Sequence, residues 1–408
     1  MNNIFSKNYR EGKINYWAVI LLVLLFVFVS NGYNIVGWGY MVPKRYTYLL
    51  IAIAFYYIVT NYTTIRQSNP FFSKYALFMF MWPLVTVLCR AINGGNLGEE
   101  FFSCYSWVSL IFLYFVFCKY KVREFDLIIA LSISAIIGAS IQIYEQLNPS
   151  EAICGIITQD SEFYMGEVAE IRNNLFRFIV GNPRLPILMA CFYWCCITKK
   201  FNFVYAIPLF LFLVSVYLFL TRQILISLAA SFAFSFILQS KSKNKNWALI
   251  AIIIGVFFVH KYWSILFADL ADSYEQNTGS TDIRIEGITY YLRVLASDPI
   301  SAIIGHGHNT AIQAAADRLH FFANDIGFIG EAFLYGVIWI IPYFVLLYKV
   351  AKVYHKTLPL YIVLFIITTA ISSIMIFPYR NGSEMYIWAC VLYIAELHLT
   401  GKTKLTLK

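Results

Sequence analysis

The chain has 408 residues, of which 60% are apolar and only 13% are charged, and its mean hydropathy is +0.66. Soluble domains carry about 25% charged residues, so this composition excludes an ordinary soluble enzyme. The net charge of +9 does not indicate a nucleic-acid-binding or disordered chain, because both classes are much less hydrophobic. The composition predicts a polytopic protein in contact with a lipid bilayer, with no nucleic-acid partner.

Apolar runs that could cross a bilayer occur along most of the chain. A spanning helix needs about 20 mostly apolar residues, because backbone groups find no water to pair with in hydrocarbon. The runs predict an all-α fold, a polytopic transmembrane helical bundle of about 12 spans. The predicted spans are residues 15–33, 46–62, 73–91, 103–119, 124–143, 184–199, 202–220, 222–239, 247–266, 327–348, 358–378 and 385–400.

The basic residues predict the direction of these spans, because Lys and Arg are enriched in cytoplasmic loops. With both termini in the cytoplasm, 19 of the 31 basic residues lie inside, and 16 of those are Lys. Of the 12 outside, ten are Arg. Arg offers a planar fork of donors that matches phosphate oxygens, so an Arg-rich outer face indicates binding of a phosphorylated, lipid-linked anion. The alternative is that these arginines pair with acids or reach lipid headgroups.

Two long outer segments divide the chain. We expect residues 1–266 to form a bundle of about nine spans, with an outer loop at 144–183. Residues 267–326 form a second, larger outer loop, and 327–408 form the C-terminal transmembrane helices. Loops of this length are usually functional or partly folded.

The larger loop contains short amphipathic helices. Residues 283–295 carry apolar side chains near one face, as expected of a helix lying at a membrane interface. Asp298 and Pro299 end this helix, because the residue before proline disfavours helical geometry. A loop of sequence GHGHN follows at 305–309, and residues 311–322 predict a second short helix.

Several outer arginines are candidate anion ligands. Arg222 lies between two apolar runs, and an arginine so near hydrocarbon usually faces a protein interior or an aqueous cavity. Arg284 begins the amphipathic helix, whereas Arg293 on the same helix is expected to be a surface or ion-pairing residue. Arg380, in the last outer turn, and Arg177, before the sixth span, are secondary candidates. Arg222 could instead be a turn residue that reaches the headgroups.

Three residues are candidate catalytic groups. His306 and His308 could act as a general base or as donors to an oxyanion, because histidine titrates near neutral pH. We expect no metal at these histidines, since no third ligand is nearby in the sequence. Asp325 is either a general base for a sugar hydroxyl or a helix N-cap. Glu331 is a further polar contact if it faces the bundle interior.

Other chemistries have no support in the sequence. No nucleotide-binding, dinucleotide-binding, serine-hydrolase or zinc-protease motif is found, so no cofactor is expected. The eight cysteines show no paired CxxC spacing, and they predict neither a disulfide framework nor a metal site.

These features together resemble the superfamily of O-antigen polymerases (Wzy-type) and O-antigen ligases, which are polytopic membrane glycosyltransferases. The likeness lies in the number of spans, the large late outer loop, an Arg at a middle outer turn (Arg222), and the run from 284 to 307, RIEGITYYLRVLASDPISAIIGHG. The segments NDIGFIGEAFLYG (324–336) and RFIVGNP (177–183) resemble the polymerase members. Ligases carry a His-Asn pair just before a late span, where this chain has Ala-Asn-Asp at 323–325, and this difference favours a polymerase.

The resemblance implies glycosyl transfer at the periplasmic face of the bacterial inner membrane, within O-antigen (lipopolysaccharide) or related polysaccharide biosynthesis. Undecaprenyl-diphosphate-linked repeat units would be polymerised without a metal. Arg222, Arg284, Arg380 and Arg177 would bind the diphosphate, and Asp325, His306 or His308 would orient or deprotonate the acceptor. A chain-length regulator and a flippase are the implied protein partners. The alternatives are a ligase that transfers glycan to lipid A-core, and a repeat-unit flippase or other transporter.

Overall fold

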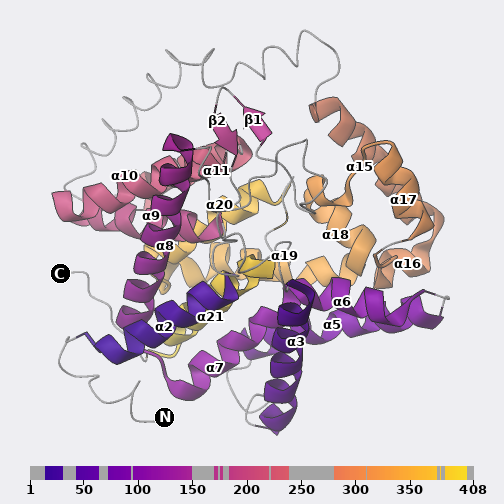
Figure 1. Ribbon diagram of the computed structural model, residues 1–408, viewed down its shortest axis with the longest axis horizontal. Coiled ribbons are helices and arrows are strands. Elements are labelled where there is room, and N and C mark those ends of the chain that lie inside the picture. The colour runs from indigo at the N-terminus through magenta and orange to yellow at the C-terminus, as the bar shows by residue number, and fades with distance from the viewer. Residues whose placement is uncertain are drawn as a thin grey trace.

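The chain folds almost entirely into helices (Figure 1). The computed structural model describes residues 14–30, 43–63, 72–92, 95–148, 170–172, 175–177, 183–219, 222–238, 280–308, 310–374, 377 and 382–401. The helices of the first half are α2 (Tyr16–Val29), α3 (Pro43–Thr60), α5 (Phe72–Ile92), α6 (Leu97–Val108), α7 (Phe112–Tyr120), α8 (Glu124–Leu147), α9 (Arg184–Lys199), α10 (Phe203–Leu218) and α11 (Arg222–Leu238). Those of the second half are α15 (Ser280–Ser297), α16 (Pro299–Ile304), α17 (Ala311–Arg318), α18 (Gly327–Tyr335), α19 (Val337–Lys352), α20 (Leu360–Ser372) and α21 (Gly382–Leu399). The predicted all-α class is confirmed for the described residues, apart from one small hairpin.

That hairpin lies in the predicted outer loop at 144–183. Strands β1 (Glu170–Arg172) and β2 (Leu175–Arg177) pair antiparallel, with Ile171 opposite Phe176. Three short 3-10 turns complete the described structure: η2 (Ser109–Ile111), η4 (Ala323–Asp325) and η5 (Tyr354–Lys356).

Polar side chains cap several helix starts. The Asn96 side chain accepts hydrogen bonds from the first N–H groups of α6. Asp298 ends α15 and caps α16 by accepting from the Ser301 N–H, so the predicted break at Asp298 and Pro299 is confirmed. Such caps satisfy N–H groups that have no partner within the helix.

The number of membrane spans is not confirmed by helix length. Among the described residues, two helices are long and apolar enough to cross a membrane, α5 and α8, and the bent pair of α6 with α7 makes a third if it counts as one span. The apolar parts of α2, α3, α10, α11, α20 and α21 are shorter. The span predicted at 247–266 lies outside the described residues. The twelve-span bundle therefore stays a prediction.

Glycine explains why one predicted span is broken. The predicted run 327–348 forms two helices, α18 and α19, that separate at Gly336. Gly336 has φ +86° and ψ 159°, a conformation essentially restricted to glycine. A Cβ there would lie 2.1 Å from the carbonyl oxygen of Ile303, so the break is also where the last turn of α16 passes close to the end of α18.

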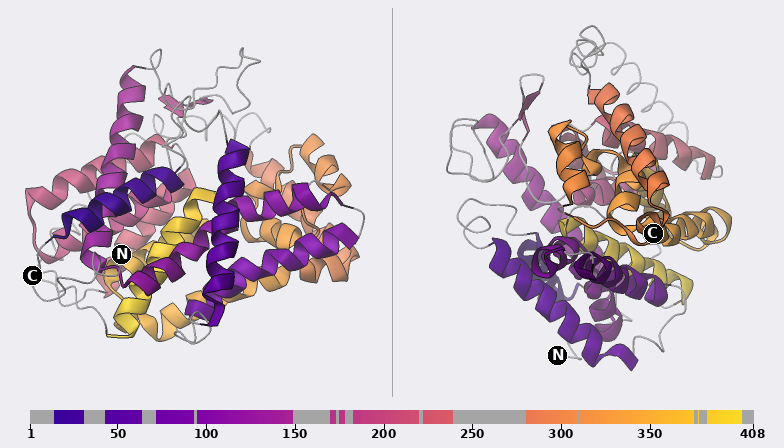
Figure 2. Two further views of the ribbon diagram at one scale, coloured as in Figure 1. Left: turned by 60° about the horizontal axis from the view of Figure 1, so that its bottom comes forward. Right: turned by 90° about the vertical axis from the view of Figure 1, so that its right-hand side faces the viewer.

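The helices pack in three groups around a shared apolar core. Helices α2, α8, α9 and α10 pack together, and α9 of this group contacts α20. Helix α11 also packs against α20. Helices α3, α5, α6 and α7 pack with α21, whereas α15, α16, α18 and α19 form the third group. In Figure 1, α15, α16 and α18 are seen in orange on the right, and α19 lies nearer the centre. In the right panel of Figure 2 this orange group faces the viewer, above the purple helices of α5 and α6. The outer-loop helices of the sequence prediction are therefore folded onto the bundle.

Candidate functional site

A cavity of about 250 Å³ lies between α15 and the turn before α18. Its lining residues come from the start of α15 and from 320–326: Ile283, Arg284, His320, Phe321, Phe322, Asp325 and Ile326. Two of the residues proposed from the sequence, Arg284 and Asp325, thus share one cavity although 41 positions separate them. Arg284 is half-buried and Asp325 is exposed.

Helix α15 is held in this position by its buried aromatic face. Tyr291 is fully buried, and its hydroxyl donates to the carbonyl of Phe321 at 2.9 Å. Its ring packs edge-on against Phe333 of α18, with 4.7 Å between centroids. Because Phe321 itself lines the cavity, the same contact that docks α15 also positions part of the cavity wall.

The cavity combines a cation with a carboxylate in reach of solvent. Within the described residues, Arg284 and Asp325 do not form an ion pair with each other. The guanidinium can therefore offer its donors to an anion, since Arg pairs well with phosphate oxygens. Asp325 ends η4 directly before α18, and an ionised carboxylate there can accept a hydrogen bond from a hydroxyl group.

The two histidines of the GHGHN loop lie elsewhere. The loop runs beside the end of α18, where the N–H groups of His306 and Gly307 donate to the carbonyls of Phe333 and Leu334. The His306 ring stacks on the ring of Phe333, at 4.8 Å and 18°. Burial lowers the pKa of the His306 imidazole below its ordinary value, which favours the neutral ring.

His308 contacts a different set of groups. Its N–H donates to Oε1 of Glu100 at 2.7 Å, and its Nε2 lies 3.1 Å from the hydroxyl of Tyr335. Neither histidine lines the cavity that holds Arg284 and Asp325. Of the three candidate bases, only Asp325 is brought to Arg284 in the described structure.

The side chains of the remaining predicted arginines are not described by the structure. Arg222 begins α11 and Arg177 lies in β2, but their side chains are outside what the structure describes, as is the whole of Arg380. Helix α11 packs against α20, whereas α15 packs against α18. The convergence of Arg222 with Arg284 on one headgroup therefore stays a prediction.

One buried arginine was not singled out from the sequence. Arg184 begins α9, is fully buried, and donates from Nη1 to the hydroxyl of Ser372 at the end of α20, at 3.0 Å. The signal was present, because Arg184 stands at the edge of an apolar run just as Arg222 does. The argument that such an arginine faces a protein interior applies to it directly.

A second polar cluster lies around His308. His308 is joined by Glu100 and Cys104 of α6, and the ligating atoms of the three side chains all lie within 4.8 Å of one another. Glu100 and Cys104 both come from α6, about 200 positions before His308 in the sequence, and His306 is not part of this group. The sequence argument considered only ligands near the histidines, whereas folding brings α6 to His308 from a distant segment.

Glu331, expected as an interior polar contact, is buried in α18. Its Oε2 accepts a hydrogen bond from Nε1 of Trp339 at 3.2 Å. This contact crosses the break at Gly336 and joins α18 to α19.

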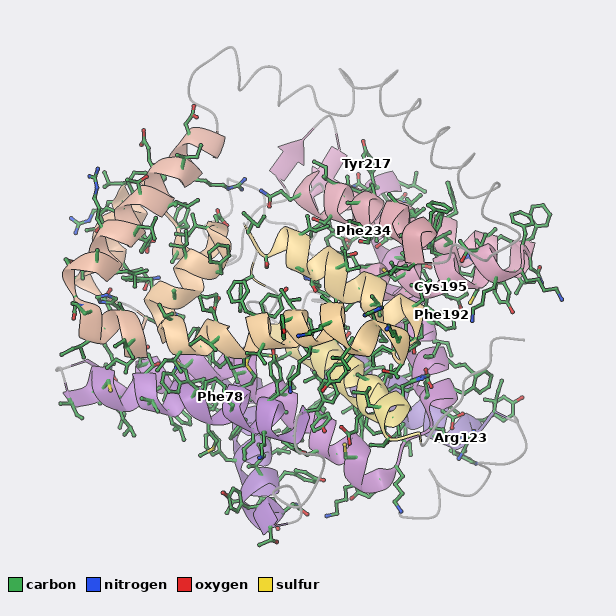
Figure 3. The ribbon with its side chains drawn as sticks, turned by 180° about the vertical axis from the view of Figure 1, so that it is seen from behind. Phe78, Arg123, Phe192, Cys195, Tyr217 and Phe234 are labelled. Carbon is green, nitrogen blue, oxygen red and sulfur yellow. The ribbon has the colours of Figure 1, made fainter. Side chains whose placement is uncertain are left out.

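The other end of the bundle carries its own polar network. The buried carboxylate of Glu124, at the start of α8, accepts from the Tyr361 hydroxyl at 2.7 Å and lies 2.9 Å from Nε2 of His398. The neighbouring Arg123 forms an ion pair with Asp126 at 2.6 Å. Figure 3 shows Arg123 toward the bottom of the molecule, well away from Tyr217 near the top, at the last turn of α10.

Comparisons with known proteins do not assign the chain to a family. No family model matches it, and no curated protein or solved structure does.

Proposed function

We propose that the chain is a multi-pass protein of the bacterial inner membrane, with both termini in the cytoplasm. The contacts between helix ends support this topology. Ends assigned to the cytoplasmic side meet each other, as in Lys119 with Asn61 and His398 with Glu124. Ends assigned to the outer side also meet each other, as in Arg184 with Ser372, Ser30 with Tyr386 and His308 with Glu100.

Exposed apolar side chains support contact with lipid. On α10, Phe203, Ile207 and Phe210 lie on one face and are 71%, 70% and 70% exposed. On α2, Tyr16 and Trp17 are exposed to a similar degree. Apolar surfaces of this kind are costly in water and are expected where a helix faces a bilayer or a partner.

For the same chain we propose glycosyl transfer from a polyprenyl-diphosphate-linked glycan at the outer face, as in the polymerases it resembles. The observation that carries this proposal is the shared cavity of Arg284 and Asp325. Arg284 would bind the diphosphate, and Asp325 would orient the acceptor hydroxyl and accept its proton.

The chemistry suits these two groups. The diphosphate leaving group gains negative charge as the glycosidic bond breaks, and a positioned guanidinium stabilises that charge. Removing one such donor from an enzyme typically lowers the rate about 10²–10³-fold. Asp325 is exposed, which allows a second glycan to approach it. His306 and His308 are assigned no part in proton transfer, because they do not line this cavity.

The test is surface-glycan analysis of cells that carry Arg284→Ala or Asp325→Asn. We expect both variants to lose the ladder of glycan lengths and retain single-repeat products. The matched control is Arg293→Ala, an exposed arginine two and a half turns along the same helix, which should keep the full ladder. Membrane levels of all variants must be equal.

Other gel patterns would contradict the proposal. A full ladder from Arg284→Ala would exclude its role in diphosphate binding. Deletion of the chain that leaves uncapped lipid A-core with accumulated lipid-linked polymer would indicate a ligase, and loss of flipped repeat units would indicate a transporter.

A further inference from the structure

Three potential metal ligands meet between α6 and the GHGHN loop, outside the cavity described above. Glu100 and Cys104 belong to α6 and are 3% and 0% exposed. Cys104 Sγ lies 3.5 Å from Oε1 of Glu100. His308 completes the group, and all three ligating atoms lie within 4.8 Å of one another.

The local structure holds these side chains together. Residues 100 and 104 are four apart in α6, so they lie on the same face one turn from each other. The loop that carries His308 begins directly after Ile304, the last residue of α16. This end of α16 is hydrogen-bonded to α5, because the Thr86 hydroxyl donates to the carbonyl of Ile304 at 2.8 Å. The Trp82 indole of α5 also donates to the carbonyl of Tyr335 at 2.7 Å.

We propose that Glu100, Cys104 and His308 form a binding site for a divalent transition-metal ion of the Zn²⁺ class. Thiolate, imidazole and carboxylate are the ligands that Zn²⁺ takes in proteins, with a thiolate selecting against Mg²⁺ and Ca²⁺. Ligand atoms around tetrahedral Zn²⁺ lie roughly 3.5 Å apart, so atoms that now lie within 4.8 Å of one another need to approach by about 1.3 Å at most. Water supplies the fourth ligand.

Charge also favours a divalent ion here. Binding releases the thiol proton of Cys104 to solvent, and the dication then balances the thiolate and the Glu100 carboxylate. The imidazole Nε2 of His308 would bind the ion in place of its contact with the Tyr335 hydroxyl. The backbone N–H of His308 would keep its hydrogen bond to Glu100.

The ion would have a structural role. It would join α6 to the loop between α16 and α17, and so fix the segment that runs beside α18. None of the three ligands lines the cavity of Arg284 and Asp325, so the site does not depend on the proposed transferase activity.

The experiment is titration of the purified full chain in detergent with Co²⁺ alone, followed by competition with Zn²⁺. We expect one ion per chain, with a near-ultraviolet charge-transfer band from the cobalt–thiolate bond that Zn²⁺ abolishes. Cys104→Ser should lose this band, and His308→Ala should bind at least tenfold more weakly. Cys191→Ser, which removes a buried cysteine of α9, is the control and should keep the band.

Circular dichroism and gel filtration check that each variant is folded. If Cys104→Ser does not fold, the loop variant His308→Ala and the wild-type stoichiometry still decide the matter. A wild-type chain that binds no Co²⁺, or a band that survives in Cys104→Ser, would show that the cluster is held by hydrogen bonds only.

Discussion

Replacing Gly336 with alanine tests the close passage between the end of α18 and the last turn of α16. Gly336 has φ +86°, and a Cβ there would lie 2.1 Å from the carbonyl oxygen of Ile303, far inside the 3.4 Å of ordinary contact. The backbone conformation costs a residue with a side chain about 1–3 kcal/mol. Forcing the two segments apart adds about 1–3 kcal/mol.

Gly401 provides the matched control. It also has a positive φ, of +65°, but a Cβ at this position would meet no atom within 4 Å. Gly401→Ala therefore carries only the conformational cost, about 1–2 kcal/mol. The difference between the two variants measures the cost of the close contact together with any extra backbone strain at Gly336.

The assay is denaturant unfolding of the purified chain in detergent, followed by tryptophan fluorescence. We expect Gly336→Ala to lose about 2–6 kcal/mol of unfolding free energy, a large part of the roughly 5–15 kcal/mol typical of folded proteins. Gly401→Ala should lose clearly less. Equal losses in the two variants would refute the close approach of Gly336 to Ile303.

Three further predictions use single side chains. Arg284→Lys keeps the charge but loses the planar fork, so we expect shorter glycan ladders in gel analysis; unchanged ladders would mean that charge alone suffices. Tyr361→Phe removes a hydrogen bond to the buried carboxylate of Glu124 and should cost about 1.5–3 kcal/mol of unfolding free energy. The control Tyr393→Phe loses a hydrogen bond to a neutral carbonyl and should cost about 0.5–1.5 kcal/mol. If denaturant unfolding showed the larger loss for Tyr393→Phe, the assigned network would be contradicted. Hydrogen bonds within the α16 cap hold the pKa of the Asp298 carboxyl below its ordinary value, so its stabilising contribution is complete above that ordinary pKa and is lost as the pH falls through the lowered one. Asp298→Asn should remove this acid-dependent loss, measured as the unfolding midpoint against pH, and an unaltered pH profile would argue against the cap.

The sequence by itself determined the helical class and several helix boundaries. Apolar runs mark most of the helices, and the break at Asp298 and Pro299 lies where the structure has it, because proline and a capping carboxylate act on their immediate neighbours. It also identified Arg284 and Asp325 as candidates. Their chemical character is a property of the residues, whatever their surroundings.

Only the tertiary structure decided which candidates lie together. Asp325 lines the same cavity as Arg284, because α15 and α18 pack through Tyr291. His308 instead contacts Glu100, because the loop between α16 and α17 packs on α6. Such contacts join segments far apart in the chain, and the free energy that selects them comes from packing over many residues. Local sequence patterns therefore do not predict which distant segments pack together.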